Sequence, residues 1–303
     1  MDELRFDGRV AVITGAGRGL GRAYALLLAS RGAKVVVNDS GVSRHGEGGD
    51  AGPAQDVVDE IVAAGGEAVA STDSVASPEG GQSIVDAATS RFGRIDILIC
   101  NAGINRPSLL RDMSWEQFST VLGVHLHGAF HVVRAALPRM CDAGYGRVVL
   151  TSSIAGLYGN KMSGAYSVAK AGLIGLSNTV AIENAEHGVT CNAIVPAAVT
   201  RLSEGIDTSS FPTMTPEQVA PSVAWLVHEA CTSTGETWVS LAGRIAKAHV
   251  AETGGVYQPD WTIEQVAAQA EAIGDKRDQL IFPPVPSGFY DHLQSSFRMT
   301  RGE

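Results

Sequence analysis

The sequence predicts an α/β protein: a doubly wound, mostly parallel seven-stranded sheet with helices on both faces, followed by a C-terminal extension. Three observations lead to this prediction. Short runs rich in valine and isoleucine alternate along the chain with longer segments. The runs are almost continuously apolar, which is typical of strands that are buried on both faces. The intervening segments are long enough for the crossover helices that parallel strands require.

Seven runs have the length and composition of buried strands. In chain order they are residues 9–14, 34–38, 67–71, 95–100, 147–152, 189–195 and 237–241. Helices are predicted between them, for example over 19–31, 77–92, 115–141 and 163–187. A sheet connected in this way forms a single Rossmann-type domain, which binds ligands beyond the carboxyl ends of its strands.

The alternation of strands and helices is interrupted once and then ends. Residues 40–53 are rich in glycine and are predicted to form a surface loop inserted after the second strand. After about residue 242 the alternation stops, so the sequence divides into a domain at 1–242 and an extension at 243–303. The extension has one helical candidate at 262–273 and is expected to pack on the same domain or on a neighbouring subunit.

The composition argues against several classes of protein. Hydrophobic residues make up 45% of the 303 residues and charged residues 18%, as in an ordinary globular protein. A formal net charge of −9 argues against a nucleic-acid partner. The four cysteines form no CxxC pair, so buried thiols are expected and no metal site. No apolar run approaches the ~18 residues of a membrane span and no signal peptide is recognised, so a soluble, cytoplasmic protein without membrane partners is expected.

A glycine-rich turn follows the first predicted strand directly. Gly15, Gly19 and Gly21 lie in the segment GAGRGLG. Leu20 stands where the plain GxGxxG pattern would have its last glycine. Glycines let the backbone approach a pyrophosphate, which then lies at the N-terminus of the following helix. A tight turn without a ligand is the alternative. Four glycines in seven residues between the first strand and the first helix favour a dinucleotide site.

An acidic residue ends the second predicted strand. Asp39 lies 18 residues beyond Gly21, where a carboxylate can accept hydrogen bonds from the ribose hydroxyls of adenosine. This favours NAD, because the 2′-phosphate of NADP would face a fixed negative charge. Arg18 in the glycine turn could instead serve a 2′-phosphate, so NADP stays open as the less favoured cofactor. Taken alone, Asp39 could also be a turn residue.

Five motifs together resemble the short-chain dehydrogenase/reductase family over roughly residues 8–242. They are TGAGRGLG at 14–21, Asp73 in TDSV, CNAG at 100–103, TSS at 151–153 and YSVAK at 166–170. One glycine turn would be weak support, but five motifs in this order and spacing are specific. The resemblance implies an NAD(P)-dependent oxidoreductase that acts on CH–OH groups and assembles as a homodimer or homotetramer.

A narrower resemblance extends to about residue 255. RFDGRV, HLHGAF, YGRVVLTSSIAGLYGN, WLVHEAC and GRIAKAHV are similar to the (3R)-hydroxyacyl-CoA dehydrogenases found in type 2 peroxisomal multifunctional enzymes and in stand-alone bacterial relatives. It implies an acyl-CoA substrate and a role in lipid metabolism. A steroid or another secondary alcohol is the alternative substrate. A non-catalytic NAD-binding sensor is a further alternative, although such proteins typically lose the tyrosine or the lysine of the YSVAK motif.

The resemblance assigns catalytic roles to three residues. Tyr166 and Lys170 are four residues apart, so both project from one face of a helix. Tyr166 would take the proton of the substrate hydroxyl, and a nearby ammonium would lower the pKa of this tyrosine. Lys170 would also hold the nicotinamide ribose. Ser153, thirteen residues before Tyr166, would hydrogen-bond the substrate oxygen. A lone tyrosine–lysine pair would more often be an exposed helical pair.

The remaining site residues are also implied by the resemblance. Contacts with the cofactor are expected from Gly15, Arg18, Gly19, Leu20, Gly21, Asp39, Asp73, Ser74, Val75, Asn101, Ala102, Gly103, Tyr166, Lys170, Ala198, Val199 and Thr200. Ala197 departs from the usual Pro-Gly segment of the family. His125 stands where most relatives have asparagine and could relay protons through its ring or its backbone carbonyl. Residues 202–222 are predicted to form a lid over the substrate.

Overall fold

The computed structural model describes residues 3–203, 205 and 207–301. The chain divides into two compact units, Met1–Ala246 and Lys247–Glu303, close to the predicted boundary at 242. The first unit contains the sheet up to the start of its last strand and all of the predicted site residues. In the part of the chain that the structure describes, no helix has the length and apolarity needed to span a bilayer.

The sheet confirms the predicted fold class, although it has eight strands where seven were expected. The strands are β1 (Val10–Thr14), β2 (Lys34–Asn38), β3 (Glu67–Ser71), β4 (Ile97–Cys100), β5 (Gly146–Thr151), β6 (Val189–Ala197), β7 (Thr237–Leu241) and β8 (Arg244–Ala248). Their spatial order is β3-β2-β1-β4-β5-β6-β7-β8, and every pair from β3 to β7 is parallel. The order reverses next to β1, so β1 and β4 flank the switch point where such sheets bind ligands.

The additional strand is the edge strand β8. Ala242 and Gly243 have φ values of 48° and 79° and connect it to β7 in a two-residue turn, which is typical of a hairpin. The residues of β8 are mostly exposed and two of its five side chains are basic, unlike the continuously apolar runs of the buried strands. An edge strand with one paired side needs no apolar run, and this explains why the sequence pattern missed it.

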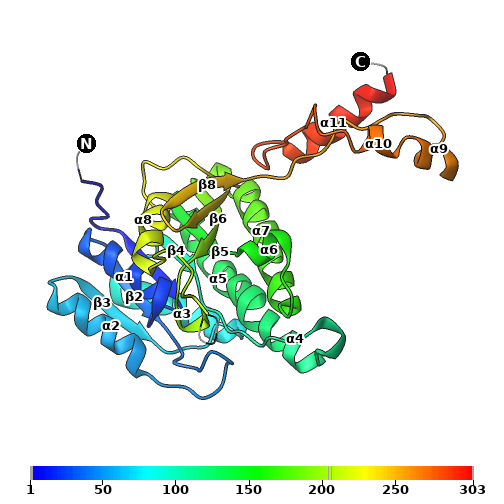
Figure 1. Cartoon of the computed structure of the whole chain (residues 1–303). Coiled ribbons are helices and arrows are strands. Elements are labelled where there is room, and N and C mark those ends of the chain that lie inside the picture. Colours follow the sequence, from blue (N-terminus) through cyan, green and yellow to red (C-terminus); the bar gives the residue numbers. More distant parts are fainter. Residues whose placement is uncertain (1–2, 204, 206, 302–303) are drawn as a thin grey trace. The chain divides into compact units, whose positions relative to one another are not determined.

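Helices cover both faces of the sheet (Figure 1). The first face carries α1 (Gly19–Ser30), α2 (Gly52–Ala63) and α8 (Pro216–Leu226), and the second carries α3 (Pro78–Phe92), α5 (Gly128–Asp142) and α7 (Gly164–Glu183). Shorter helices are α4 (Trp115–Leu122), α6 (Ile154–Tyr158) and the 3₁₀ turns Leu110–Asp112, Ala185–His187 and Arg201–Ser203. The predicted helix at 115–141 is divided by a π-helical turn, Gly123–His127, which carries His125. Such turns often occur at functional sites.

Two predicted loops contain more structure than expected. The glycine-rich insert ends in α2, which begins at Gly52. Residues 40–50 are hydrogen-bonded to the loop after β4. The predicted lid at 202–222 includes residues 204 and 206, which lie outside the described residues. From Pro216 onward this segment is the start of α8, where Val219 and Ala220 are buried in the main core. That part of the predicted lid is therefore a fixed element of the domain.

The second unit contains α9 (Ile263–Ala268), α10 (Ala270–Ile273) and α11 (Gly288–Arg301). The first two correspond to the helix predicted at 262–273. Glu252 pairs with Leu280 through reciprocal backbone hydrogen bonds, and its carboxylate contacts His292 of α11 at 3.0 Å. The sequence pattern did not predict α11, because the preceding PPVP segment indicates a break and the helix is mostly polar.

Candidate active site

A pocket of about 290 Å³ lies beyond the carboxyl ends of the strands. Twelve of the predicted cofactor residues line it: Gly15, Arg18, Gly19, Leu20, Asp39, Asp73, Ser74, Val75, Asn101, Ala102, Gly103 and Thr200. They come from five separate loops, which follow β1, β2, β3, β4 and β6. The fold thus gathers residues that lie up to 185 positions apart in the sequence around one cavity.

The glycine turn between β1 and α1 is held close to the loop after β4. A Cβ on Gly15, whose φ is 64°, would stand 2.7 Å from Ala102 Cα, so glycine is needed for this approach. Thr14 Oγ1 accepts hydrogen bonds from the backbone N–H groups of Asn101 and Ala102 at 3.0 and 3.1 Å. The amide of Asn101 in turn donates to Thr14 O and Gly15 O. Asn101 therefore connects the two loops and fixes the shape of this wall.

Asp39 connects the glycine turn to the insert after β2. Its Oδ2 accepts a hydrogen bond from Gly17 N at 3.0 Å, and its Oδ1 accepts one from Gly41 N at 2.8 Å. Each carboxylate oxygen keeps a further lone pair, so both can still accept from a ligand in the pocket. The exposed Arg18 also belongs to the pocket wall, so the structure places both groups that the sequence weighed for cofactor choice at this site.

The loop after β3 forms the opposite end of the pocket. Asn38 donates through its amide to Ser71 O, to Ser71 Oγ and to Asp73 O, which ties the ends of β2 and β3 together. Ser71 Oγ then donates to the Asp73 carboxylate at 3.0 Å. Behind this loop, His131 Nδ1 contacts Val75 O at 3.1 Å. Asp73 and Val75 are thus positioned by a partly buried polar network.

The three predicted catalytic residues lie on two neighbouring elements. Ser153 follows β5 and caps α6 by accepting a hydrogen bond from Ala155 N at 3.2 Å. Tyr166 and Lys170 lie one turn apart on α7, with the Lys170 Nζ 5.5 Å from the centre of the Tyr166 ring. The hydroxyl of Ser153 interacts with that of Tyr166 and favours its ionised form. The structure therefore brings Ser153, Tyr166 and Lys170 together.

Each residue of the TSS segment contacts a different part of this group. Thr151 O accepts a hydrogen bond from Lys170 Nζ at 2.5 Å, and Ser152 Oγ donates to Lys170 O at 2.7 Å. Ser153 faces Tyr166. The buried hydroxyl of Ser152 is thus engaged with the backbone of α7, which supports the assignment of the substrate role to Ser153.

Burial changes the acidity of Tyr166 and Lys170. It lowers the pKa of Lys170, which is 3% exposed, to about 7. Burial also raises the pKa of Tyr166, and the interaction with Ser153 only partly offsets this rise. In the protein itself, removal from water is the larger influence and keeps the pKa of Tyr166 above its usual value. The lowering expected from the Lys170 ammonium stays a prediction. A positive charge that arrives with a ligand would act in the opposite direction.

His125 connects the catalytic helix to the pocket wall. Its Nε2 lies 2.7 Å from Ile104 O and 3.0 Å from Ile104 N, and its ring packs edge-on against Tyr166 at 5.1 Å. A Cβ on Gly103 would stand 2.4 Å from His125 Cε1, so the glycine of CNAG makes room for this ring. Burial, followed by the charge of Lys170, lowers the pKa of His125 to about 3. The imidazole is consequently neutral and cannot serve as a cationic group.

Some predicted cofactor residues lie outside the pocket wall. A Cβ on Gly21 would stand 2.2 Å from Gly15 O, so this glycine allows α1 to pack tightly on the turn instead of facing a ligand. Ala198 packs against the main core, and Val199 donates from its backbone to Met214 O at 2.7 Å. Lys170 lines a separate cavity of about 10 Å³, which shares Val75, Ala102 and Val124 with the pocket.

The structure adds pocket residues that sequence reasoning did not identify. They are Asn38, Ser40, Val42, Gly46, Ala76, Ile104, Thr120, Val124 and Arg201. Three of them, Ser40, Val42 and Gly46, belong to the insert after β2, which was predicted as a surface loop. Their proximity depends on tertiary contacts, and the only signal in the sequence is that the insert directly follows Asp39.

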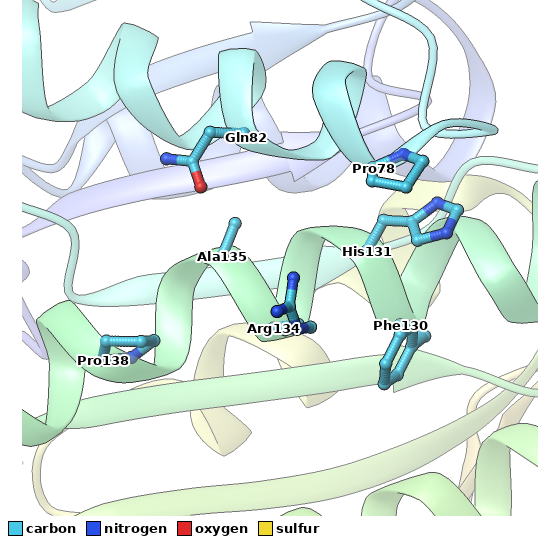
Figure 2. A pocket seen from close by; sticks show the side chains of 7 residues that line it. All are labelled: Pro78, Gln82, Phe130, His131, Arg134, Ala135 and Pro138. Atoms are coloured by element: carbon cyan, nitrogen blue, oxygen red, sulfur yellow. The ribbon is translucent and has the colours of Figure 1, made fainter.

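Another cavity is lined by residues outside the candidate active site. A groove of about 430 Å³ lies between α3 and α5, with Gln82 on one helix and Phe130 and Arg134 on the other (Figure 2). None of the predicted site residues lines this groove, and its histidine, His131, already contacts Val75 O. Among the described residues, no group of three or more histidine, cysteine, aspartate or glutamate side chains could hold a metal ion.

The groups around the pocket fit a dinucleotide. Arg18, the N-cap residue of the 12-residue helix α1, makes no side-chain capping hydrogen bond, so the first N–H groups of this helix keep the capacity to bind a phosphate. Asp39 and Asp73 supply acceptors for ribose hydroxyls, and Ile104 and Val124 supply apolar wall next to Tyr166. Lys170 lies at the adjoining cavity.

Comparisons with known proteins agree with this geometry. A family model described as short chain dehydrogenase matches residues 9–205. The peroxisomal multifunctional enzyme type 2 of Drosophila melanogaster is 49% identical over 85% of this chain, which spans only 43% of that enzyme. The solved structure of the full-length Drosophila enzyme aligns with a TM-score of 0.81 at 40% identity, covering 98% of this chain and 51% of the other.

A solved short chain dehydrogenase from Mycobacterium avium is similar along almost its whole length. It is 41% identical to this chain, with a TM-score of 0.78, and the alignment covers 88% of this chain and 94% of the other. The family model, the parallel sheet and the glycine turn beside a serine–tyrosine–lysine group all lead to one assignment. This chain belongs to the short-chain dehydrogenase family of NAD(P)-dependent oxidoreductases.

Proposed function

We propose that the protein is an NAD-dependent oxidoreductase that interconverts a secondary alcohol and a ketone, with a (3R)-hydroxyacyl-CoA as its substrate. The observation that carries the reaction type is the group Ser153, Tyr166 and Lys170, of which Tyr166 packs against Ile104 in the wall of a pocket that suits a dinucleotide. A non-catalytic NAD-binding protein would not need the hydroxyls of Ser153 and Tyr166 beside this buried lysine, whose charged form is costly to bury.

The chain's own residues would supply the proton chemistry. Ser153 would hold the substrate oxygen, and Tyr166 would take the hydroxyl proton during oxidation or return it during reduction. Lys170, fixed by Thr151 O, would stabilise the tyrosinate when it is protonated and would bind the ribose. When bound, the nicotinamide would supply the acceptor or donor of hydride. His125 would hold Tyr166 in place, since its neutral ring packs against the tyrosine and bonds Ile104.

The preference for NAD is proposed from Asp39. Because both of its oxygens already accept backbone hydrogen bonds, the carboxylate is held at the pocket and would repel a 2′-phosphate. Asp39→Asn should lower the ratio of kcat/KM for NAD to kcat/KM for NADP by about tenfold, in line with ~1.4 kcal/mol for one charge interaction. Steady-state kinetics with both cofactors would measure this ratio.

Asp73→Asn is the matched control for the Asp39 variant. It removes a carboxylate from the other end of the same pocket, so it should weaken both cofactors alike and leave the ratio unchanged. If Asp39→Asn leaves the ratio unchanged while Arg18→Ala changes it, Arg18 determines the preference and the proposal for Asp39 is wrong.

The acyl-CoA substrate is proposed from the similarity to the peroxisomal multifunctional enzymes. Purified protein should reduce NAD with (3R)-hydroxyacyl-CoAs at a kcat/KM at least 100-fold higher than with the free hydroxy acids, sterols or simple secondary alcohols, as measured by NADH absorbance. The (3S) epimers are the matched control and should be poor substrates. Turnover of a steroid or simple alcohol without turnover of any acyl-CoA would overturn the substrate class and leave the reaction type intact.

Several further expectations stay predictions. These are assembly as a homodimer or homotetramer, cytoplasmic location, and packing of residues 243–303 on the same domain or on a neighbouring subunit.

A further inference from the structure

Residues 40–50 fold into a closed loop beside the pocket, and we call this segment the strap. Its base is closed where Asp50 N donates to Ser40 O at 3.3 Å. Gly41 has a φ of 67°, and a Cβ there would stand 1.8 Å from Asp50 O, so glycine is needed at this position. Near the tip, Ser43 Oγ accepts hydrogen bonds from two backbone N–H groups of the strap. The strap therefore has a defined structure of its own.

The tip of the strap is fastened to the loop after β4. Asn105 N donates to Arg44 O at 2.8 Å, and Arg106 Nε donates to His45 O at 2.9 Å. His45 Nδ1 lies 3.0 Å from Asn105 O. These bonds join segments about 60 residues apart, so the strap crosses from the end of β2 to the end of β4.

The inner side of the strap forms part of the pocket wall. Ser40, Val42 and Gly46 line the cavity. Val42 also packs into a small apolar cluster around Ile104 that includes Tyr166. A Cβ on Gly46 would stand 3.1 Å from the Ile104 side chain, so the strap lies directly on that residue. The strap thus contacts both the nucleotide pocket and the surroundings of the catalytic tyrosine.

The volume of the pocket favours movement of one of its walls when a dinucleotide binds. The cavity of about 290 Å³ is at the lower limit of the ~300–1,000 Å³ of small-molecule sites, and a dinucleotide is a large ligand. Most of the wall is anchored on strands and helices of the core. The strap is instead held by the bonds at its tip, by the bond from Gly41 N to Asp39 at its base and by contacts of Val42 and Gly46 with the Ile104 cluster. One further bond comes from Arg201, whose guanidinium donates to Val42 O at 3.0 Å. A few such bonds can open at small cost.

We propose that the strap is the gate of the nucleotide pocket, and that Arg106 and His45 are positioning residues that hold it closed. This inference rests on the proposed binding of NAD or NADP in this pocket. Neither residue belongs to the pocket wall, so each acts on the cofactor only through the strap. A gate slows entry and exit alike, whereas the loss of a direct contact with a ligand speeds exit alone.

The test measures the binding kinetics of NADH to the full chain without substrate. Arg106→Ala removes the bond to His45 O and should raise both the association and the dissociation rate constants about tenfold. The Kd should then change by less than about threefold. Stopped-flow fluorescence of NADH gives both constants. His45→Ala, which removes the contact with Asn105 O, should shift both constants in the same direction, and thermal unfolding would check that each variant is folded.

Two control variants test whether the loss of a charged side chain, without loss of a bond to the strap, changes the rate constants. Arg106 also pairs with Glu116 at 3.6 Å, and Glu116→Gln removes this pair without touching the strap. Arg111→Ala removes a largely exposed arginine of the same loop, which pairs with Asp112. Both controls should leave the rate constants within about twofold of those of the wild type.

The outcomes distinguish a failure of the gate proposal from a failure of the proposed cofactor binding. If only the dissociation rate constant is higher in the folded variants, or if neither constant changes, the gate proposal is wrong. The pocket would then remain a cofactor site. If the wild type binds neither NADH nor NADPH, the cofactor assignment fails and the gate fails with it. A parallel rise of both constants in Arg106→Ala and His45→Ala, absent from the two controls, supports the gate.

Discussion

Tyr166→Phe is expected to lower kcat by about 10³-fold while leaving the Kd for NADH within about threefold of the wild-type value. The substitution removes the hydroxyl proposed to exchange the proton, and such groups typically contribute 10²–10⁴-fold. The phenylalanine ring would keep the edge contact with His125 and the packing around Ile104. Steady-state rates with the substrate that gives the highest turnover, together with calorimetric titration of NADH, would measure the two quantities.

Tyr24→Phe is the matched control for this substitution. Tyr24 lies on α1 and is 1% exposed, and its hydroxyl has no hydrogen-bond partner among the described residues. Its removal should leave kcat unchanged and should not lower the stability, because a buried unpaired hydroxyl is unfavourable. If Tyr166→Phe keeps more than a tenth of the wild-type kcat, Tyr166 is not the proton-exchanging residue.

The strands, and the grouping of Ser153 with Tyr166 and Lys170, could be predicted because each is marked by a local pattern. A buried parallel strand needs an apolar run, and the structure pairs these runs as parallel strands. The spacing of Tyr166 and Lys170 alone places both on one helix face. The edge strand β8 escaped this reasoning, because one exposed side allows charged residues such as Arg244 and Lys247.

The features that could not be predicted depend on contacts between distant segments. The strap is ordered by bonds from Arg106 and Arg201, and no local pattern indicates which loop a guanidinium will reach. Gly21 belongs to the recognised motif, but the structure shows that its role is close packing on Gly15. The pKa of Tyr166 depends on how completely the fold excludes water, and this cannot be derived from the distance to Lys170 along a helix.

Lys170→Met is expected to lower kcat and to raise the free energy of unfolding. Lys170 is buried and its ammonium donates to Thr151 O. Methionine has a similar length and avoids the cost of burying a charge, although it leaves Thr151 O without this donor. The free energy of unfolding at pH 6 should therefore rise by ~1–3 kcal/mol, and kcat should fall by at least 10²-fold.

The pH dependence of this gain follows from the pKa of Lys170. In the folded protein the pKa is lowered from 10.5 to about 7, so between these values the unfolded state binds more protons than the native state. The stability of the wild type should consequently rise with pH in this window. The advantage of Lys170→Met should be greatest below pH 7 and should shrink toward pH 10.

Urea unfolding at pH 6, 7, 8 and 9 would measure this trend for the wild type, for Lys170→Met and for a control. Lys276 is exposed, so Lys276→Met should change the stability by less than about 0.5 kcal/mol at each pH. A Lys170→Met variant that is less stable than the wild type at pH 6, or whose advantage does not vary with pH, would contradict the argument. Burial of the Lys170 ammonium would then not lower the free energy of unfolding of the protein.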